Sequence, residues 1–104
     1  MKTIKAYEFK DLSKEVKKEV LSKETEEEVM FQLEVLDSDL ENEYITEEDY
    51  YERLGCDKNY AETTAWFVPS CYYDENKKQV DKEVKNILKE YLFTIKGRFI
   101  QRKD

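Results

Sequence analysis

The chain of 104 residues contains no histidine, two cysteines, two glycines and one proline. Without histidine, catalysis by an imidazole base and zinc sites built on imidazole ligands are excluded. Two cysteines are too few for a zinc site, and two isolated glycines leave no glycine-rich loop to hold a phosphate. No carboxylate pair stands in an apolar stretch that would shift its pKa. We therefore expect no enzymatic activity and no cofactor.

The chain also lacks long apolar runs. No stretch approaches the roughly 20 apolar residues that a membrane-spanning helix needs, and Lys2 is followed by no signal-peptide core. We expect a soluble intracellular protein with no membrane partner, in which Cys56 and Cys71 stay reduced as partly buried thiols. The length fits one domain covering residues 1–104, and an aromatic content of 13 % argues against disorder.

Charge is distributed unevenly along the chain. The net charge is −7, yet residues 19–62 contain sixteen acidic and three basic side chains. The flanking ranges 1–18 and 63–104 each carry a net charge of +3. Such a middle segment repels phosphates and attracts a basic protein groove. A direct nucleic-acid partner is therefore not expected for this part of the chain.

The pattern of apolar residues predicts an α+β fold that is mostly helical, with about four helices and a short antiparallel sheet of two to four strands. Capping residues mark three helix starts, at Asp11 or Ser13, at Thr25 and at Thr46. In order, the predicted elements are a strand over 3–9, a helix from Ser13, a longer helix from Thr25, a short helix from Thr46 to Gly55, a loop over 56–63, a strand over 64–68 stopped by Pro69, a helix from about Glu75 to Tyr91, and a strand or hairpin over 93–100 around Lys96 and Gly97.

The longer helix has three distinct faces. Val29, Leu33, Leu36 and Leu40 share one face and are expected in the core. Phe31 and Val35 form a second apolar face, for which we expect burial on two sides; a contact surface is the alternative. The third face is an acidic ridge, which we define as Glu27, Glu34, Asp37 and Glu41.

The acidic ridge has the charge density of a nucleic-acid strand. Residues 24–43 contain nine carboxylates on a helix about 30 Å long, where one DNA strand carries about nine phosphates. Tyr44, Tyr50 and Tyr51 flank it, and tyrosine is enriched in binding hot spots. The ridge is interpreted either as a mimic of nucleic acid or as a plain solubilising surface.

A metal loop is a second hypothesis for the same segment. Asp37, Asp39, Glu41 and Glu48 approximate the oxygen-ligand spacing of an EF-hand calcium loop. Asn42 stands where the glycine of the sharp turn belongs, which weakens the match. An acidic helix end is the commoner explanation.

A basic row marks the last predicted helix. It consists of Lys78, Lys82, Lys85 and Lys89, and acidic residues interrupt it. Four lysines in a chain of net charge −7 make a weak footprint for phosphate. We interpret the row, together with Asp81 and Glu83, as a solvated helix face.

The segment from Tyr7 through Phe9, Asp11, Leu12 and Ser13 to Glu15 resembles the beginning of many small bacteriophage and prophage proteins. These begin with a strand, an aromatic pair, an acid-Leu-Ser cap and a lysine-rich helix. The stretch from Ile45 to Gly55 is similar in character. The resemblance covers about the first fifth of the chain and implies a phage-encoded origin. Most of these proteins have no assigned activity, so no functional residues carry over. Small acidic phage proteins often block host defence, as anti-CRISPR proteins do.

The sequence thus favours a non-enzymatic phage inhibitor, of anti-CRISPR type, in the cytoplasm of the bacterial host. Its partner would be a basic host protein that handles nucleic acid, such as a CRISPR effector. The alternatives are a calcium-responsive module that uses residues 37–48 and a scaffold protein that self-associates through Phe31 and Val35. The residues expected to contact the partner are Glu27, Glu34, Asp37, Glu41, Tyr44, Glu47, Glu48, Asp49, Tyr50 and Tyr51.

Overall fold

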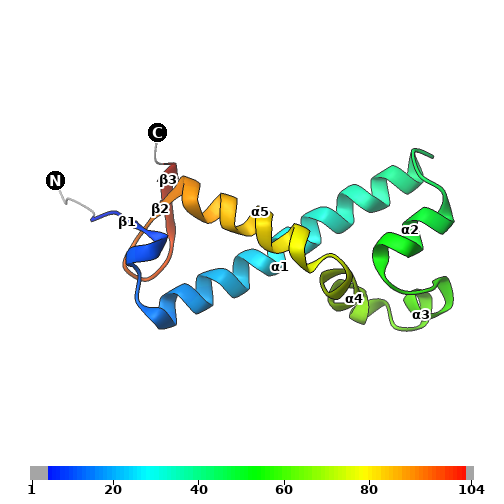
Figure 1. Ribbon diagram of the computed structural model, residues 1–104, viewed down its shortest axis with the longest axis horizontal. Helices are drawn as coiled ribbons and strands as arrows, with labels where there is room; N and C mark the ends of the chain where they lie inside the picture. Colours follow the sequence, from blue (N-terminus) through cyan, green and yellow to red (C-terminus); the bar gives the residue numbers. More distant parts are fainter. Residues whose placement is uncertain (1–4, 103–104) are drawn as a thin grey trace. The chain divides into compact units, whose positions relative to one another are not determined.

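The computed structural model describes residues 5–102 of the chain. Within this range it contains five α-helices, two short 3-10 helices and one three-stranded antiparallel sheet (Figure 1). The predicted α+β class is confirmed. The elements are β1 (Tyr7–Glu8), η1 (Phe9–Asp11), α1 (Lys14–Glu41), α2 (Glu47–Leu54), α3 (Lys58–Thr63), η2 (Ala65–Phe67), α4 (Val68–Glu75), α5 (Lys77–Glu90), β2 (Tyr91–Phe93) and β3 (Phe99–Arg102).

The chain divides into two compact units, which we describe separately. The sheet unit comprises Met1–Glu26 and Asp81–Asp104, and the helical unit comprises Glu27–Val80. That the two units form one domain, as the sequence predicts, stays a prediction.

The sheet unit is built around Phe93, which is completely buried. Strand β2 lies between β1 and β3 (Figure 1), and Tyr7 pairs with Phe93 in the antiparallel register. The ring of Phe93 lies 6.1 Å from that of Phe9 and 4.7 Å from that of Phe99. The predicted strand over 3–9 is confirmed for Tyr7–Glu8; residues 3 and 4 lie outside the described range. At Phe9 the chain turns into η1 instead of continuing the strand, which places this ring against Phe93.

The predicted hairpin around Lys96 and Gly97 is confirmed, and its turn depends on glycine. The backbone N–H of Thr94 donates to Arg98, and Gly97 has φ +88°. A Cβ at Gly97 would lie 2.5 Å from a methyl carbon of Val20 and 2.8 Å from one of Val16. Both the left-handed backbone and the close approach to α1 therefore require glycine.

Helix α1 is continuous over 28 residues, so the separate helix predicted to begin at Thr25 is wrong. Ser13 does cap the start, because its hydroxyl accepts from the N–H of Val16. The hydroxyl of Thr25 instead donates to the carbonyl of Leu21, one turn back, at 2.7 Å. A threonine inside a helix satisfies its hydroxyl in this way, and α1 contains no glycine or proline that would interrupt it.

Helix α2 follows the sequence prediction closely. Thr46 caps its start: the hydroxyl accepts from the N–H of Asp49 at 3.1 Å, and the Asp49 carboxylate accepts from the N–H of Thr46 at 3.4 Å. This reciprocal pair is a capping box. Gly55 ends the helix in the left-handed conformation with φ +85°, as predicted.

Two further predictions are wrong in the segment after α2. Residues 58–63, expected as loop, form α3, because the Asp57 carboxylate accepts from the N–H of Tyr60 at 2.7 Å and caps the helix. Residues 64–68, expected as a strand, form η2 and the start of α4. Pro69 does not stop a strand there; it lies in the first turn of α4, where no backbone N–H is needed.

Helix α5 spans Lys77–Glu90, within two residues of its predicted limits. Val84 and Leu88 are buried on its inner face in the sheet unit, and its predicted lysine row is exposed. Among the described residues, no helix combines the length and apolar character required to cross a bilayer.

Alanine substitution should have different effects at Thr46, which caps the start of α2, and at Thr25, which lies inside α1. Thr46→Ala removes a cap and should lower the free energy of unfolding by about 1 kcal/mol. Thr25→Ala removes only a bond to the preceding turn and introduces the best helix former, so it should leave stability unchanged or raise it. Urea unfolding followed by circular dichroism measures both. A loss of about 1 kcal/mol in Thr25→Ala would mean that a helix begins there after all.

Candidate functional site

A buried hydrogen-bond network orients the C-terminal half of α1 within the helical unit. The side-chain oxygen of Gln32 accepts from the Tyr72 hydroxyl at 2.7 Å and from the Gln79 amide at 3.1 Å. The Gln32 amide nitrogen donates to Glu28 at 2.9 Å. Gln32 is 9 % exposed, and burial raises the pKa of the Tyr72 hydroxyl, which keeps it protonated as the donor. Three of the four predicted core residues, Val29, Leu33 and Leu36, are buried on the same face, and Leu40 is half-buried.

The opposite face of α1 is exposed, which corrects one expectation. Phe31 is 59 % and Val35 is 46 % exposed, so the predicted burial on two sides is wrong and the contact-surface alternative remains. Once Gln32 and Leu33 face inward, the helical period turns Phe31 and Val35 outward. Glu27 and Glu34 lie one turn on either side of Phe31 and are exposed as well. An apolar pair therefore borders the acidic ridge.

The C-terminus of α1 displays Tyr44. The backbone N–H of Tyr44 donates to the backbone carbonyl of Asp39 at 2.9 Å, and that of Glu43 donates to the carbonyl of Leu40 at 3.1 Å. This pair of bonds is the Schellman arrangement. Glu43 occupies the left-handed position with φ +61°, where glycine is usual. The residue after it usually packs on the last turn, but the position it would contact is Asp39. Tyr44 is accordingly 77 % exposed.

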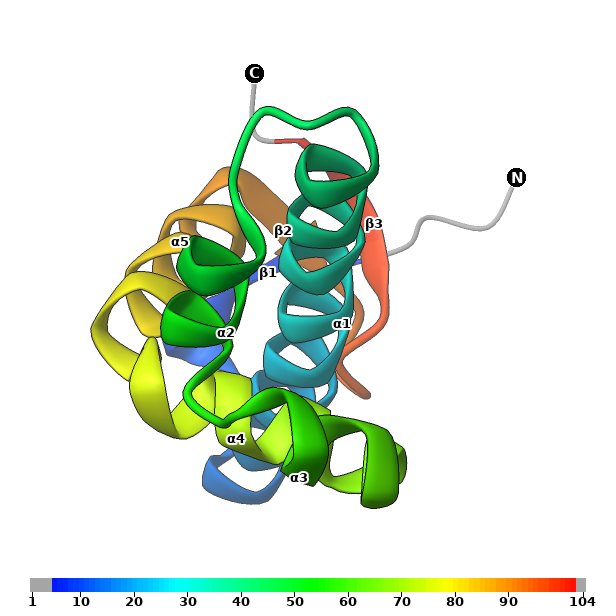
Figure 2. The same cartoon turned by 90° about the vertical axis from the view of Figure 1, so that its right-hand side faces the viewer.

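Asp37 of α1 and Tyr50 of α2 are joined by a hydrogen bond, and Figure 2 shows α2 beside the C-terminal half of α1. The Tyr50 hydroxyl donates to the Asp37 carboxylate at 2.5 Å. The ring of Tyr51 meets that of Tyr50 edge-on at a centroid distance of 4.9 Å. Partial burial, followed by the hydrogen bond to Asp37, raises the pKa of Tyr50 far above its usual range. Asp37 thus serves the fold and is less available to a partner.

The remaining predicted carboxylates fall into two groups. Glu47 pairs with Lys58 at 3.2 Å, which raises the pKa of the Lys58 ammonium, and Asp49 belongs to the capping box. Within residues 5–102, no hydrogen bond or ion pair engages the other four side chains. These four, which we call the open carboxylates, are Glu27, Glu34, Glu41 and Glu48, and all are exposed.

The calcium-loop alternative does not fit the structure. Asp37, Asp39 and Glu41 lie in the last turns of α1, whereas an EF-hand loop needs these ligands on a non-helical segment that wraps around the ion. Asp37 also holds Tyr50. In the part of the chain that the structure describes, no group of three or more acidic or cysteine residues could hold a metal ion.

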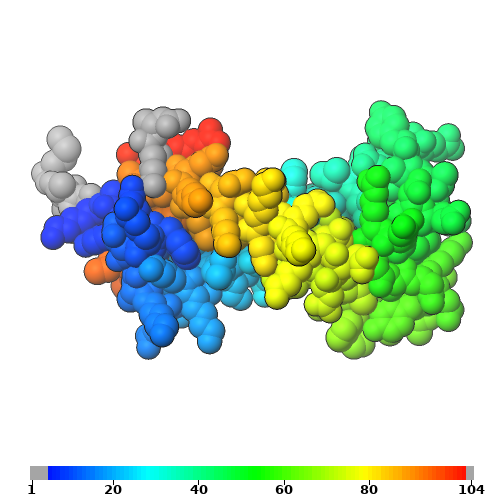
Figure 3. All heavy atoms as spheres, viewed as in Figure 1, coloured from blue at the N-terminus to red at the C-terminus, as the bar shows by residue number. Residues whose placement is uncertain are grey.

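The predicted contact residues omit three exposed aromatic side chains. Tyr60, Trp66 and Phe67 are 42 %, 77 % and 43 % exposed, and the Trp66 and Phe67 rings meet edge-on at 5.1 Å. The loop and strand predicted over this segment do not reveal their exposure. The signals that could have located them are the Asp57 cap and a proline placed where a helix starts. Figure 3 shows α2 and α3, in green, forming an outer surface of the helical unit.

The two thiols interact with each other in the helical unit. Cys56 and Cys71 are free and half-buried. Burial and the neighbouring Cys71 thiol raise the pKa of Cys56. A raised pKa lowers the thiolate fraction at neutral pH, and the thiolate is the nucleophilic form.

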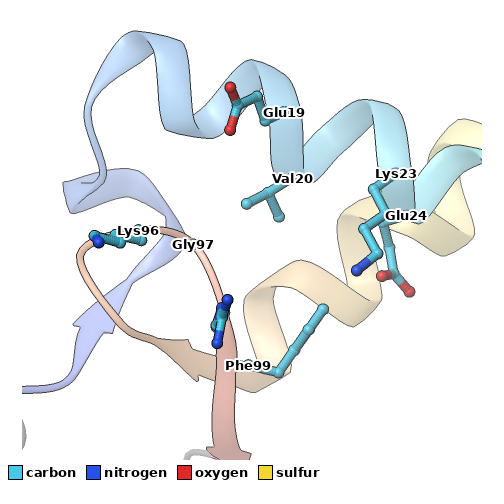
Figure 4. A pocket seen from close by; sticks show the side chains of 8 residues that line it. Glu19, Val20, Lys23, Glu24, Lys96, Gly97 and Phe99 are labelled. Carbon is cyan, nitrogen blue, oxygen red and sulfur yellow. The ribbon is translucent and has the colours of Figure 1, made fainter.

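A pocket of about 400 Å³ lies in the sheet unit, outside the predicted site (Figure 4). Both cationic and acidic side chains line it, so the lining favours neither a cation nor an anion. The lining residues are Glu19, Val20, Lys23 and Glu24 of α1 with Lys96, Gly97, Arg98 and Phe99 of the hairpin.

Charge follows the division into units. The helical unit contains fifteen acidic and four basic side chains, a net charge of −11. The sheet unit contains ten acidic and fourteen basic side chains, a net charge of +4. All ten predicted contact residues belong to the helical unit.

Comparison with known proteins adds no relative to this description. Neither a family model, nor a curated protein, nor a solved structure matches the chain.

The left-handed residue at the end of α1 predicts a stabilising substitution. Glu43→Gly should raise the free energy of unfolding by about 1 kcal/mol, because glycine adopts this backbone without the steric cost that a Cβ brings. Glu43→Ala removes the same charge but keeps the Cβ, so it should produce no comparable gain. Urea unfolding of the two variants measures the difference, and equal stabilities would contradict a left-handed Glu43.

The Tyr50–Asp37 hydrogen bond predicts the alkaline titration. Tyr50 should ionise well above the usual tyrosine range when absorbance near 295 nm is followed, and Tyr50→Phe should remove one tyrosine from that late step. Since its pKa is higher in the folded than in the unfolded protein, its stabilising contribution is complete below pH of about 10 and is lost as the pH rises further. A late step of unchanged amplitude in Tyr50→Phe would refute the assignment.

Proposed function

We propose that this protein is a phage-encoded inhibitor, non-enzymatic and of anti-CRISPR type, that acts in the cytoplasm of a bacterial host. It binds a basic protein that handles nucleic acid and occupies the groove where the nucleic acid would lie. The single observation that supports this proposal best is the outer face of the helical unit. Open carboxylates border exposed apolar side chains there, on a unit of net charge −11.

The spacing of the open carboxylates supports mimicry of a phosphate backbone. Glu27, Glu34 and Glu41 recur every seven residues on one helix, which separates them by about 10.5 Å along its axis. Three phosphate steps of one DNA strand advance about 10.2 Å along the duplex axis. A groove lined with lysine and arginine therefore meets these carboxylates at the same axial repeat as every third phosphate.

The exposed apolar pair supplies what charge alone does not. Carboxylates at the surface are screened within about 8–10 Å at physiological salt, and complementary charge contributes more to the rate of encounter than to residence time. Phe31 is 59 % exposed and lies between Glu27 and Glu34. A partner that covers it removes water from an apolar surface. A polar rim around a centre enriched in aromatic residues is the usual layout of a protein interface.

The same apolar pair favours one alternative, self-association of a phage scaffold protein. Phe31 and Val35 would then form a dimer seam. Light scattering distinguishes the two: a strict monomer in low and high salt removes the scaffold function, whereas a dimer abolished by Phe31→Ala supports it. Facing copies of α1 would bring like charges together, and like charges oppose dimerisation.

Charge reversal of the open carboxylates tests the proposal. The triple variant Glu27→Lys, Glu34→Lys and Glu41→Lys should lower the affinity for a basic nucleic-acid-binding protein captured from the bacterial host at least 100-fold. Asp37 is left unchanged because it holds Tyr50. The captured protein should be released by high salt and by its own nucleic acid.

A matched variant controls for net charge. Glu15→Lys, Glu19→Lys and Glu83→Lys change the charge by the same amount at exposed helical positions of the sheet unit and should leave the affinity nearly unchanged. Circular dichroism verifies that both triple variants keep their helix content. Equal losses of affinity in the two triple variants would mean that the acidic ridge is only a solubilising surface. If nucleic acid fails to displace the captured protein, occupation of its nucleic-acid groove is excluded.

A further inference from the structure

Most of the exposed aromatic side chains among the described residues belong to the helical unit. Among the described residues, seven large apolar side chains of the helical unit are exposed, and five of them are aromatic. The sheet unit exposes four, of which only Phe99 is aromatic. The five on the helical unit are Phe31, Tyr44, Tyr60, Trp66 and Phe67.

Trp66 is the most accessible of these, together with Tyr44. It lies in η2, directly after α3, and is 77 % exposed. Its neighbour Phe67 meets it edge-on, with an angle of 81° between the ring planes. This contact uses an edge-to-face geometry and leaves most of the indole surface open, so Trp66 can receive a planar group.

Aromatic faces combined with carboxylates distinguish the two basic side chains. A lysine ammonium is a strongly hydrated point charge, for which a carboxylate is sufficient. An arginine guanidinium is planar and weakly hydrated; it binds a carboxylate with two parallel hydrogen bonds and stacks on an aromatic face. Tryptophan is the best of the aromatic acceptors for a cation.

We infer that the partner presents arginines, rather than lysines, to the helical unit, and that the indole face of Trp66 receives one guanidinium. The inference rests on the proposed function, because it specifies the chemistry of the same basic partner. The net charge of −11 attracts any cation to the unit, and the exposed aromatic rings select arginine among them.

Two synthetic peptides, nona-arginine and nona-lysine, test the selection because they carry equal charge. The wild-type protein should bind nona-arginine about tenfold more tightly, as measured by fluorescence anisotropy of labelled peptides at physiological salt. Trp66→Ala should reduce this preference to threefold or less and hardly change the affinity for nona-lysine. Ile95→Ala, which truncates a 65 % exposed apolar side chain of the sheet unit, should leave the preference intact.

The emission of Trp66 gives a second readout without substitution. Trp66 is the only tryptophan in the chain, so its fluorescence reports contact at η2 alone. Nona-arginine should quench or shift this emission at saturation, and nona-lysine should not.

The outcomes separate this inference from the proposed function. Equal affinity for the two peptides, or an arginine preference that survives Trp66→Ala, would overturn the inference and leave acidic-ridge binding in place. No detectable binding of either peptide by the wild-type protein would overturn both. Because Trp66 is largely exposed, its substitution should not unfold the chain, and circular dichroism checks this.

Discussion

The surface of the helical unit depends on one buried amide. The Gln32 side chain must have its hydrogen bonds satisfied, because an unpaired buried amide is costly. Tyr72, Gln79 and Glu28 satisfy it. This network fixes the rotation of α1 about its own axis within the unit, and the helical period then determines which residues face outward. The exposure of Phe31 beside Glu27 and Glu34 is a consequence of that rotation.

Several features of the unit oppose its stability. Glu43 adopts a left-handed backbone conformation that favours glycine, and the side chain of the next residue, Tyr44, is exposed. Phe31 and Trp66 leave apolar surface in water, and a net charge of −11 repels itself. Residues that lower the stability of the fold and have no structural role are typical of binding surfaces. The cost is offset where the chain is most regular, at the capping box of Thr46 and at the buried side chains of α1.

The helix ends and turns that form between residues close in the sequence could be predicted from the sequence. The cap at Thr46, the glycine end at Gly55 and the hairpin at Gly97 are confirmed, because each uses contacts within a few residues. The predictions around Thr25 and over residues 56–68 are wrong for a related reason. Threonine can cap a helix or bond back to the preceding turn, and a proline can stop a strand or begin a helix. The residues alone do not distinguish these uses.

Composition and the order of charges along the chain, by themselves, determined that this chain lacks imidazole chemistry and concentrates its acidic residues in positions 19–62. They also placed Glu27, Glu34 and Glu41 on one helical face, since helical period is a local property. Only the tertiary structure decided which carboxylates stay open, because Asp37 and Glu47 are engaged by residues 13 and 11 positions away. It likewise decided that Phe31, Val35 and Trp66 are exposed. Burial depends on which segments pack together, and that is a property of the whole fold.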